Sequence, residues 1–332
     1  FRQAFAQVTN PPIDPLREDC VMSLSTQIGR EGNIFHYGPE NVDHVLLNSP
    51  VLSQRKLHQL LALPRFAASH RYIDLYFDAE SSLELALERI CAEAEAAARA
   101  GIELLILSDR RPRRDTAAVH ALLATGAVHQ HLVRTGLRCE VNLIVETGTA
   151  RDPHHFACLV GFGATAVYPY LAYQTLHALG RRGILGGKAS GEPQQIGRSY
   201  RRGVKKGLLK ILSKMGIGCI ASYRGAQLFE IVGLSDEVVA RCFDGTPSRI
   251  GGAGFARLEA DAWHVAALGW DDCALPEQGG LLRYVNGGEY HQYNPDVVQA
   301  LQRAVLTGTR EDWKVSADHV NTRPPPALRD LR

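Results

Sequence analysis

The fold class is decided by Glu103-Leu104-Leu105-Ile106-Leu107-Ser108-Asp109, a short and nearly continuous apolar run closed by polar residues. A strand that is buried on both faces of a parallel sheet has this composition. The run follows a long helix rich in Ala, Glu and Leu, which begins after Ser82 and ends at Gly101. Before that helix, residues 72–77 alternate apolar and polar side chains as a strand does. Strand, helix and strand in this order predict parallel strands joined by crossover helices.

The same alternation continues toward the C-terminus. It predicts strands over 139–145, 166–169 and 218–222, and helices over 116–125, 155–161, 170–179, 200–215 and 226–232. A (β/α) barrel and an open doubly wound sheet both satisfy this order of elements. We favour an α/β fold of the TIM-like (β/α) barrel type, incomplete or irregular, because three strands end in polar residues that can form one rim. The polar ends are Ser108 with Asp109, Glu146, and Ser222 with Tyr223.

Composition predicts three segments. Residues 1–60 are interpreted as an irregular N-terminal arm, because Pro11, Pro12 and Pro15 interrupt regular structure. Residues 61–312 carry the (β/α) pattern, and residues 313–332 end in three consecutive prolines typical of a stiff linker. Because the sequence begins at Phe1 rather than Met and stops just past this linker, we expect it to be an internal piece of a larger protein.

Charge, cysteines and hydropathy exclude several classes of protein. The 37 Lys and Arg residues nearly balance 35 Asp and Glu, so no overall field attracts nucleic acid. The seven cysteines are scattered singly, without the spacing of a disulfide framework, which indicates a reducing cytoplasm. No apolar run approaches the roughly 18 residues that a membrane helix needs.

Catalytic and metal-binding motifs are absent from the sequence. It contains no GxxxxGK[ST] phosphate loop, no GxGxxG after a strand, no GxSxG elbow and no paired CxxC. His154-His155 has metal-binding residue types, but neither HExxH nor a matching carboxylate accompanies it. We interpret the two histidines as buried or capping residues, and we assign neither catalytic residues nor a metal site.

Two sets of residues have the composition of an anion site. Ser248-Arg249-Ile250-Gly251-Gly252 offers backbone amides beside a guanidinium, as an anion nest does, and a tight turn explains the same glycines. Lys206 and Lys210 belong to a basic cluster from Arg198 to Lys210, where a solvated helix face is the default interpretation.

Longer strings resemble the central domain of the large subunit of glutamate synthase. The longest match includes Ser222-Tyr223-Arg224-Gly225-Ala226-Gln227-Leu228-Phe229-Glu230, and residues 5–18 resemble the opening of that domain. Further matching runs span nearly the whole chain in order: 154–157, 161–164, 168–172, 206–217, 242–252, 287–291 and 293–295.

The resemblance implies a parent enzyme with several domains. A glutaminase domain precedes the central domain, and an FMN-binding barrel with an iron-sulfur cluster follows it. The parent combines ammonia from glutamine with 2-oxoglutarate in glutamate biosynthesis, and a small subunit can deliver the electrons. The central domain resembles the flavin barrel in fold but holds no cofactor. By this resemblance the chain has no complete catalytic centre, and its partners are the neighbouring domains of the same polypeptide rather than nucleic acid or membrane.

The resemblance also implies a role for the arm. We expect the domain to separate the glutaminase and synthase domains and to form part of the wall of the ammonia tunnel. Such a wall favours apolar side chains with a few small polar groups. The candidates are two arm segments that contain Met22, Ser25, Thr26, Asn33, Ser49 and Ser53, although a simple packing role explains each of them equally well.

Two other functions remain open from the sequence. One is a stand-alone phosphate- or flavin-binding (β/α) barrel enzyme with Arg249, Gly251, Gly252, Lys206 and Lys210 as its anion site. The other is a nucleic-acid binder that uses residues 198–210, which the low net charge and the lack of aromatic platforms disfavour.

Overall fold

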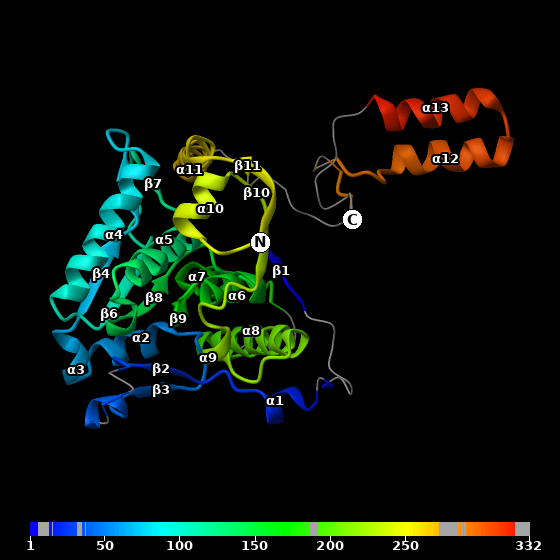
Figure 1. Cartoon of the computed structure of the whole chain (residues 1–332). Helices are drawn as coiled ribbons and strands as arrows, with labels where there is room; N and C mark the ends of the chain where they lie inside the picture. The colour runs from blue at the N-terminus through cyan, green and yellow to red at the C-terminus, as the bar shows by residue number, and fades with distance from the viewer. Residues whose placement is uncertain are drawn as a thin grey trace. The chain divides into compact units, whose positions relative to one another are not determined.

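The centre of the computed structural model is a parallel sheet of four strands in the order β4-β6-β8-β9 (Figure 1). Its strands are β4 (His70–Asp74), β6 (Leu104–Ser108), β8 (Asn142–Glu146) and β9 (Ala166–Tyr168). The structure describes residues 1–5, 13–14, 16–31, 35–36, 38–185, 192–271, 284–286, 288 and 290–322. The α/β class with parallel strands, predicted from the sequence, is confirmed, and within the described residues these four strands form an open sheet rather than a closed barrel.

Both faces of the sheet are covered, as the apolar strands predict. Leu105, Leu107 and Leu143 pack in one core cluster, whereas Leu104 and Ile106 pack in another. Successive side chains of a strand point to opposite faces, so each cluster belongs to one face of the sheet.

One face packs against the long helices. These are α4 (Leu83–Arg99), α5 (Ala121–Arg134) and α6 (Pro153–Gly161). The helix α8 (Pro193–Met215) packs on α6, and α7 (Tyr170–Arg181) packs on α8. The cap of α4 is the predicted one, because the Ser82 hydroxyl accepts a hydrogen bond from the backbone N–H of Leu85 at 3.2 Å. Gly101, with a φ of 83°, lies just beyond the end of that helix.

The N-terminal arm covers the other face. It forms α1 (Glu18–Val21), β2 (Thr26–Ile28), η1 (Pro39–Asn41), β3 (Val45–Leu47) and most of α2 (Gln54–Leu61), and α3 (Pro64–Ala67) follows it. Ile28, Leu52 and Leu57 join the cluster that contains Ile106 and Ile144. Figure 1 shows β2, β3, α2 and α3 together along this side of the sheet. The arm is therefore an integral layer of the fold.

Two single-residue bridges connect the arm to later parts of the chain. Val51 pairs in parallel with Val167 of β9, and Ser23 pairs in parallel with Cys219. The first bridge is supported by a hydrogen bond from the Val167 N–H to the Pro50 carbonyl at 2.7 Å. Residues 50–52 thus lie beside β9 as a further, very short extension of the sheet.

The remaining strands and helices up to residue 270 surround the four-stranded sheet. β5 (Tyr76–Asp78) and β7 (Thr116–Ala118) form an antiparallel pair. β1 (Arg2–Gln3) pairs with β10 (Phe229–Leu234), which pairs in parallel with β11 (Ser248–Ala253). The others are η2 (Arg138–Glu140), α9 (Ile220–Tyr223), α10 (Asp236–Cys242) and α11 (Phe255–Gly269).

Four predicted elements differ from the structure. Residues 218–222 form no strand beyond the Ser23–Cys219 bridge, and Ile220–Tyr223 is a helical turn, because a short apolar run fits either state. The predicted helix over 226–232 is absent, since Gln227 adopts a φ of 53° and the strand β10 begins at Phe229. The predicted helix over 116–125 begins only at Ala121, and residues 116–118 are β7. The predicted strand over 72–77 is two strands, β4 and β5.

The chain divides into two compact units, Phe1–Trp270 and Asp271–Arg332. In the second unit, α12 (Pro295–Thr307) and α13 (Arg310–Asn321) form a helical hairpin around Gly308, whose φ is 63°. Residues 313–321, which the sequence analysis assigned to a linker, belong to α13, whose N-cap is Thr309. Across the described residues, the helices are too short or too polar to traverse a bilayer.

Candidate functional site

Polar side chains meet at the carboxyl ends of β6 and β8, as the rim prediction required. The Ser108 hydroxyl donates to Glu146 Oε2 at 2.7 Å, and Arg110 Nη1 lies 2.9 Å from Glu146 Oε1. The Glu146 side chain is 3% exposed, so the ion pair with Arg110 compensates a buried charge. Ser222 and Tyr223, the third predicted contributors, lie in the helical turn α9 and not on a strand of this sheet.

Asp109 is held by several hydrogen bonds at the same edge. Its carboxylate accepts from the Thr147 hydroxyl and from the Gly148 N–H at 2.8 Å. Burial raises the pKa of Asp109, and these hydrogen bonds oppose the shift. The hydroxyls of Tyr76 and Tyr170 each donate to the Asp109 carbonyl at 2.9 Å.

The Arg110 guanidinium joins this network to the aromatic side chains of the rim. Its Cζ lies 5.7 Å from the ring centroid of Tyr168 and 5.8 Å from that of Tyr170. In barrel enzymes this edge of the sheet carries the catalytic groups. Here the two buried carboxylates bind neighbouring side chains and backbone amides of the same rim.

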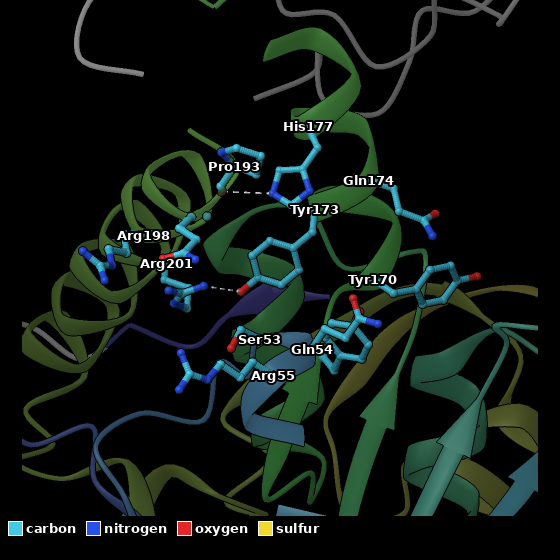
Figure 2. Close-up of a pocket in the computed structure, with 13 residues that line it drawn as sticks. Ser53, Gln54, Arg55, Tyr170, Tyr173, Gln174, His177, Pro193, Arg198 and Arg201 are labelled. Carbon is cyan, nitrogen blue, oxygen red and sulfur yellow. Dashed lines mark hydrogen bonds between the residues drawn. The ribbon is translucent and has the colours of Figure 1, made fainter. Parts of the chain in front are cut away.

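A pocket of about 390 Å³ lies beside the carboxyl end of β9 (Figure 2). Three segments build it: the start of α2, the helix α7 and the first turns of α8. The lining residues are Ser53, Gln54, Arg55, Tyr168, Tyr170, Tyr173, Gln174, His177, Pro193, Gln194, Gly197, Arg198 and Arg201. Its size is that of a small-molecule site.

Tyr173 is the central side chain of the pocket. Its hydroxyl donates to the Leu52 carbonyl at 2.9 Å, and its ring stacks on Tyr168 with 6.1 Å between centroids. Arg201 Nη1 lies 3.5 Å from the Tyr173 oxygen, and His177 Nε2 lies 3.1 Å from the Pro193 carbonyl (Figure 2). Burial raises the pKa of Tyr173, so the phenol stays protonated at neutral pH.

The predicted tunnel residues have different environments. Met22, Thr26 and Ser49 are buried, and Ser25 is partly buried. The Thr26 hydroxyl donates to the Thr165 carbonyl at 3.3 Å, which fastens the arm to the sheet.

Ser49 and Ser53 make local hydrogen bonds. The Ser49 hydroxyl accepts from the Val51 N–H at 3.2 Å, and Ser53 is the N-cap of α2. Of the predicted tunnel residues that the structure describes, only Ser53 lines the pocket. Asn33 lies outside the described residues.

The residues of the alternative anion site lie on separate elements. Arg249, Gly251 and Gly252 are in β11, and Lys206 with Lys210 are in α8, which Figure 1 shows apart from β11. Ser248–Gly252 is therefore an extended strand, neither a nest nor a turn. Arg249 forms an ion pair with Glu230 on β10 at 3.2 Å.

Gly252 is explained by close packing between strands. A Cβ at this position would overlap with the Gly233 carbonyl of β10. The glycine therefore allows the approach of two backbones and needs no anion to account for it.

The histidine pair belongs to the start of α6. Asp152 caps the helix by accepting from the N–H groups of His154 and His155, at 2.9 Å and 3.2 Å. Burial lowers the pKa of His154, whose ring contacts Gln3 and Cys158. No group of three potential metal ligands occurs among the described residues, and the six cysteines in those ranges are free thiols.

Residues that the sequence analysis missed complete the pocket. Arg55 and Tyr173 were not singled out, because neither belongs to a recognisable motif. The basic cluster from Arg198 to Lys210 was noted, but nothing in it indicates that its first turns face α2 and α7. Only the fold brings the three segments together.

Comparison with known proteins identifies the family. The family model described as "Glutamate synthase central domain" matches residues 1–235. The chain belongs to this family. The family resemblance predicted from the sequence is thereby confirmed.

The relatives of this glutamate synthase central domain are far longer chains. It is 42% identical over 345 residues to ferredoxin-dependent glutamate synthase 1, chloroplastic/mitochondrial, of Arabidopsis thaliana, covering 100% of this chain and 21% of that protein. It is 41% identical over 306 residues to the NADPH glutamate synthase large chain of Bacillus subtilis, covering 92% and 20%. The chain thus spans about a fifth of the length of these relatives.

Solved structures give weaker likenesses. A flavocytochrome b2 mutant with pyruvate bound has a TM-score of 0.32 and 13% identity, covering 49% of this chain and 41% of that one. A mandelate oxidase mutant has a TM-score of 0.31 and 14% identity, covering 46% and 38%. The assignment of the central domain rests on the family match alone.

Proposed function

We propose that this domain is a rigid spacer between the glutaminase and synthase domains of a glutamate synthase, and that its N-terminal arm forms part of the ammonia tunnel wall. The parent would hold FMN and an iron-sulfur cluster outside these 332 residues, and a small subunit is a candidate electron donor. The domain itself would have no catalytic centre. Free thiols favour a reducing compartment such as the cytoplasm, and some relatives are chloroplast proteins.

The observation that carries the proposal is the attachment of the arm to later segments of the fold. Val51 bridges to β9, Ser23 bridges to Cys219, and Thr26 bonds to the Thr165 carbonyl. A segment anchored at three points is held in one position, which a tunnel wall or a spacer requires. A loosely attached arm would admit water and release ammonia.

The rim of the sheet supports the same proposal. Glu146 and Asp109 are engaged by Arg110, Ser108 and Thr147. Side chains that stabilise one another in this way contribute to rigidity rather than to turnover.

The tunnel part of the proposal is tested with Met22→Trp in the intact enzyme. Met22 is 7% exposed and lies in the arm between α1 and the Ser23 bridge. A larger side chain there would narrow an adjacent tunnel, so glutamine-dependent glutamate formation would fall while glutamine hydrolysis continues. The measured quantity is the ratio of glutamate formed to glutamine hydrolysed.

Val21→Trp is the matched control, because Val21 is the preceding residue and is 50% exposed. It should leave the ratio unchanged, and circular dichroism should show both variants folded. If Met22→Trp keeps the two reactions coupled as in the unmodified enzyme, Met22 does not belong to a tunnel wall.

A further inference from the structure

The pocket beside β9 is strongly cationic. Arg55, Arg198 and Arg201 line it together with His177, and no aspartate or glutamate is among the thirteen lining residues. Among the described residues, none of these three arginines forms an ion pair with a carboxylate, in contrast to Arg110 on the nearby rim. The pocket therefore has cationic groups without an internal counter-charge.

Arg201 is held in position by an aromatic ring. Its Cζ lies 5.9 Å from the centroid of Tyr173, and its Nη1 lies 3.5 Å from the phenol oxygen. The phenol proton is donated to the Leu52 carbonyl, so the phenol oxygen is free to accept from Arg201. A guanidinium fixed in this way loses little conformational freedom when it binds an anion.

Positively charged side chains of α2 and α8 lie close to each other beside the pocket. The pKa of Lys205, one turn beyond Arg201 in α8, is lowered by burial and by the charges of Lys56 and Arg201. Lys56 follows Arg55 at the start of α2, so the first turn of α2 faces the cationic side of α8. Asp19 partly offsets this repulsion, but it does not line the pocket.

The rest of the lining combines aromatic rings with uncharged polar side chains. Gln54, Gln174 and Gln194 provide amide donors and acceptors, and Ser53 and Pro193 lie at the N-terminal ends of α2 and α8. The N-terminal end of a helix carries partial positive charge. Figure 2 shows residues of α2, α7 and α8 arranged around the same space.

We propose that this pocket binds a small metabolite with two negative charges, carried by a phosphate or by a pair of carboxylates. Arg55 and Arg201 bind the charged groups, and the glutamine amides bind the polar remainder of the molecule. Guanidinium groups form paired hydrogen bonds with both kinds of oxyanion. The site goes beyond the spacer function, because a bound anion would join the arm to α7 and α8.

The test uses isothermal titration calorimetry on the full 332-residue chain, with pyrophosphate and succinate as probes. Sodium chloride of equal ionic strength is the reference for unspecific charge screening. At least one probe should bind with a defined stoichiometry of one and should raise the melting temperature. Binding of pyrophosphate identifies a phosphate site, and binding of succinate identifies a dicarboxylate site.

Variants connect the binding to the pocket. Arg201→Ala and Arg55→Ala should each weaken binding about tenfold or more. Tyr173→Phe removes the oxygen that orients Arg201 and should weaken binding less. Arg202→Ala is the matched control, because Arg202 follows Arg201 on α8 but does not line the pocket.

Two results would overturn the proposal. The first is that neither probe binds at millimolar concentration, although the protein melts cooperatively and is therefore folded. The second is an equal loss of affinity in Arg202→Ala and Arg201→Ala, which would indicate general attraction to a basic helix. The spacer proposal is unaffected by either result, since it rests on the arm and is tested by coupling in the intact enzyme.

Discussion

His129 should make the stability of this domain depend on pH. It lies in α5, and its Nδ1 accepts a hydrogen bond from Arg138 Nε at 3.0 Å. Burial, followed by the charges of Arg138 and Arg224, lowers the pKa of His129 from 6.5 to about 4. A protonated ring would place a third positive charge beside two guanidinium groups and would lose its acceptor nitrogen.

The expected magnitude follows from this shift. Between about pH 6.5 and pH 4 the unfolded chain binds the proton and the folded chain does not, so the free energy of unfolding falls as the pH falls. The contribution is fully present above pH 6.5 and is lost by about pH 4, and it amounts to roughly 3 kcal/mol.

The assay is urea unfolding of the purified chain, followed by tryptophan fluorescence, at about pH 7 and about pH 4. His129→Asn keeps an acceptor oxygen for Arg138 but cannot be protonated. Between these two pH values its free energy of unfolding should therefore fall by roughly 3 kcal/mol less than that of the unmodified chain. His58→Asn, at an exposed position of α2, is the control. An equal loss in the unmodified chain and in His129→Asn would refute the reasoning.

Two further predictions concern packing and the buried ion pair. Gly126→Ala in α5 should lower the free energy of unfolding by about 1–3 kcal/mol, because the new Cβ would overlap with the Cys242 carbonyl and Phe243. Gly203→Ala in α8, where a Cβ meets no neighbouring atom, should raise it by about 0.5–1 kcal/mol. Thermal melting distinguishes them, and a loss of stability in both variants would contradict the packing argument. Arg110→Met should lower the free energy of unfolding by about 2 kcal/mol, because it leaves the buried Glu146 charge without a partner. This loss is smaller than is usual for a buried ion pair, because solvent reaches Arg110. Adding Glu146→Gln should recover part of the loss. Urea unfolding measures both, and a double variant less stable than Arg110→Met alone would show that the loss does not come from an unpaired Glu146 charge.

The sequence predicted those elements whose structure is set locally. The strands β6 and β8 have the apolar runs typical of a doubly covered sheet, and α4 has a serine cap and a glycine just beyond its end. Ser108, Asp109 and Glu146 were expected at one rim, and Ser108 and Glu146 are joined there by a hydrogen bond. In each case the residue pattern of the strands and helices was sufficient.

The errors occur where distant segments decide the structure. Residues 218–222 become a bridge and a turn because Ser23 of the arm pairs with Cys219. Residues 229–234 become a strand between β1 and β11, although their Phe, Glu and Leu residues also suit a helix. The pocket combines Arg55, Tyr173 and Arg201 from three segments, so no sequence motif could reveal it.

The pairing of the arm with late segments has a consequence for synthesis on the ribosome. The Tyr223 hydroxyl bonds to Gln3 across 220 positions, and Thr26 bonds to Thr165 across 139. Contacts this far apart in sequence form slowly, because a long loop must close first. The arm emerges early and has to wait, with Leu52 and Leu57 exposed, until β9 and α9 have been translated. We expect nascent chains that stop before residue 165 to be bound by chaperones at the arm, and chains that extend beyond α9 to be released.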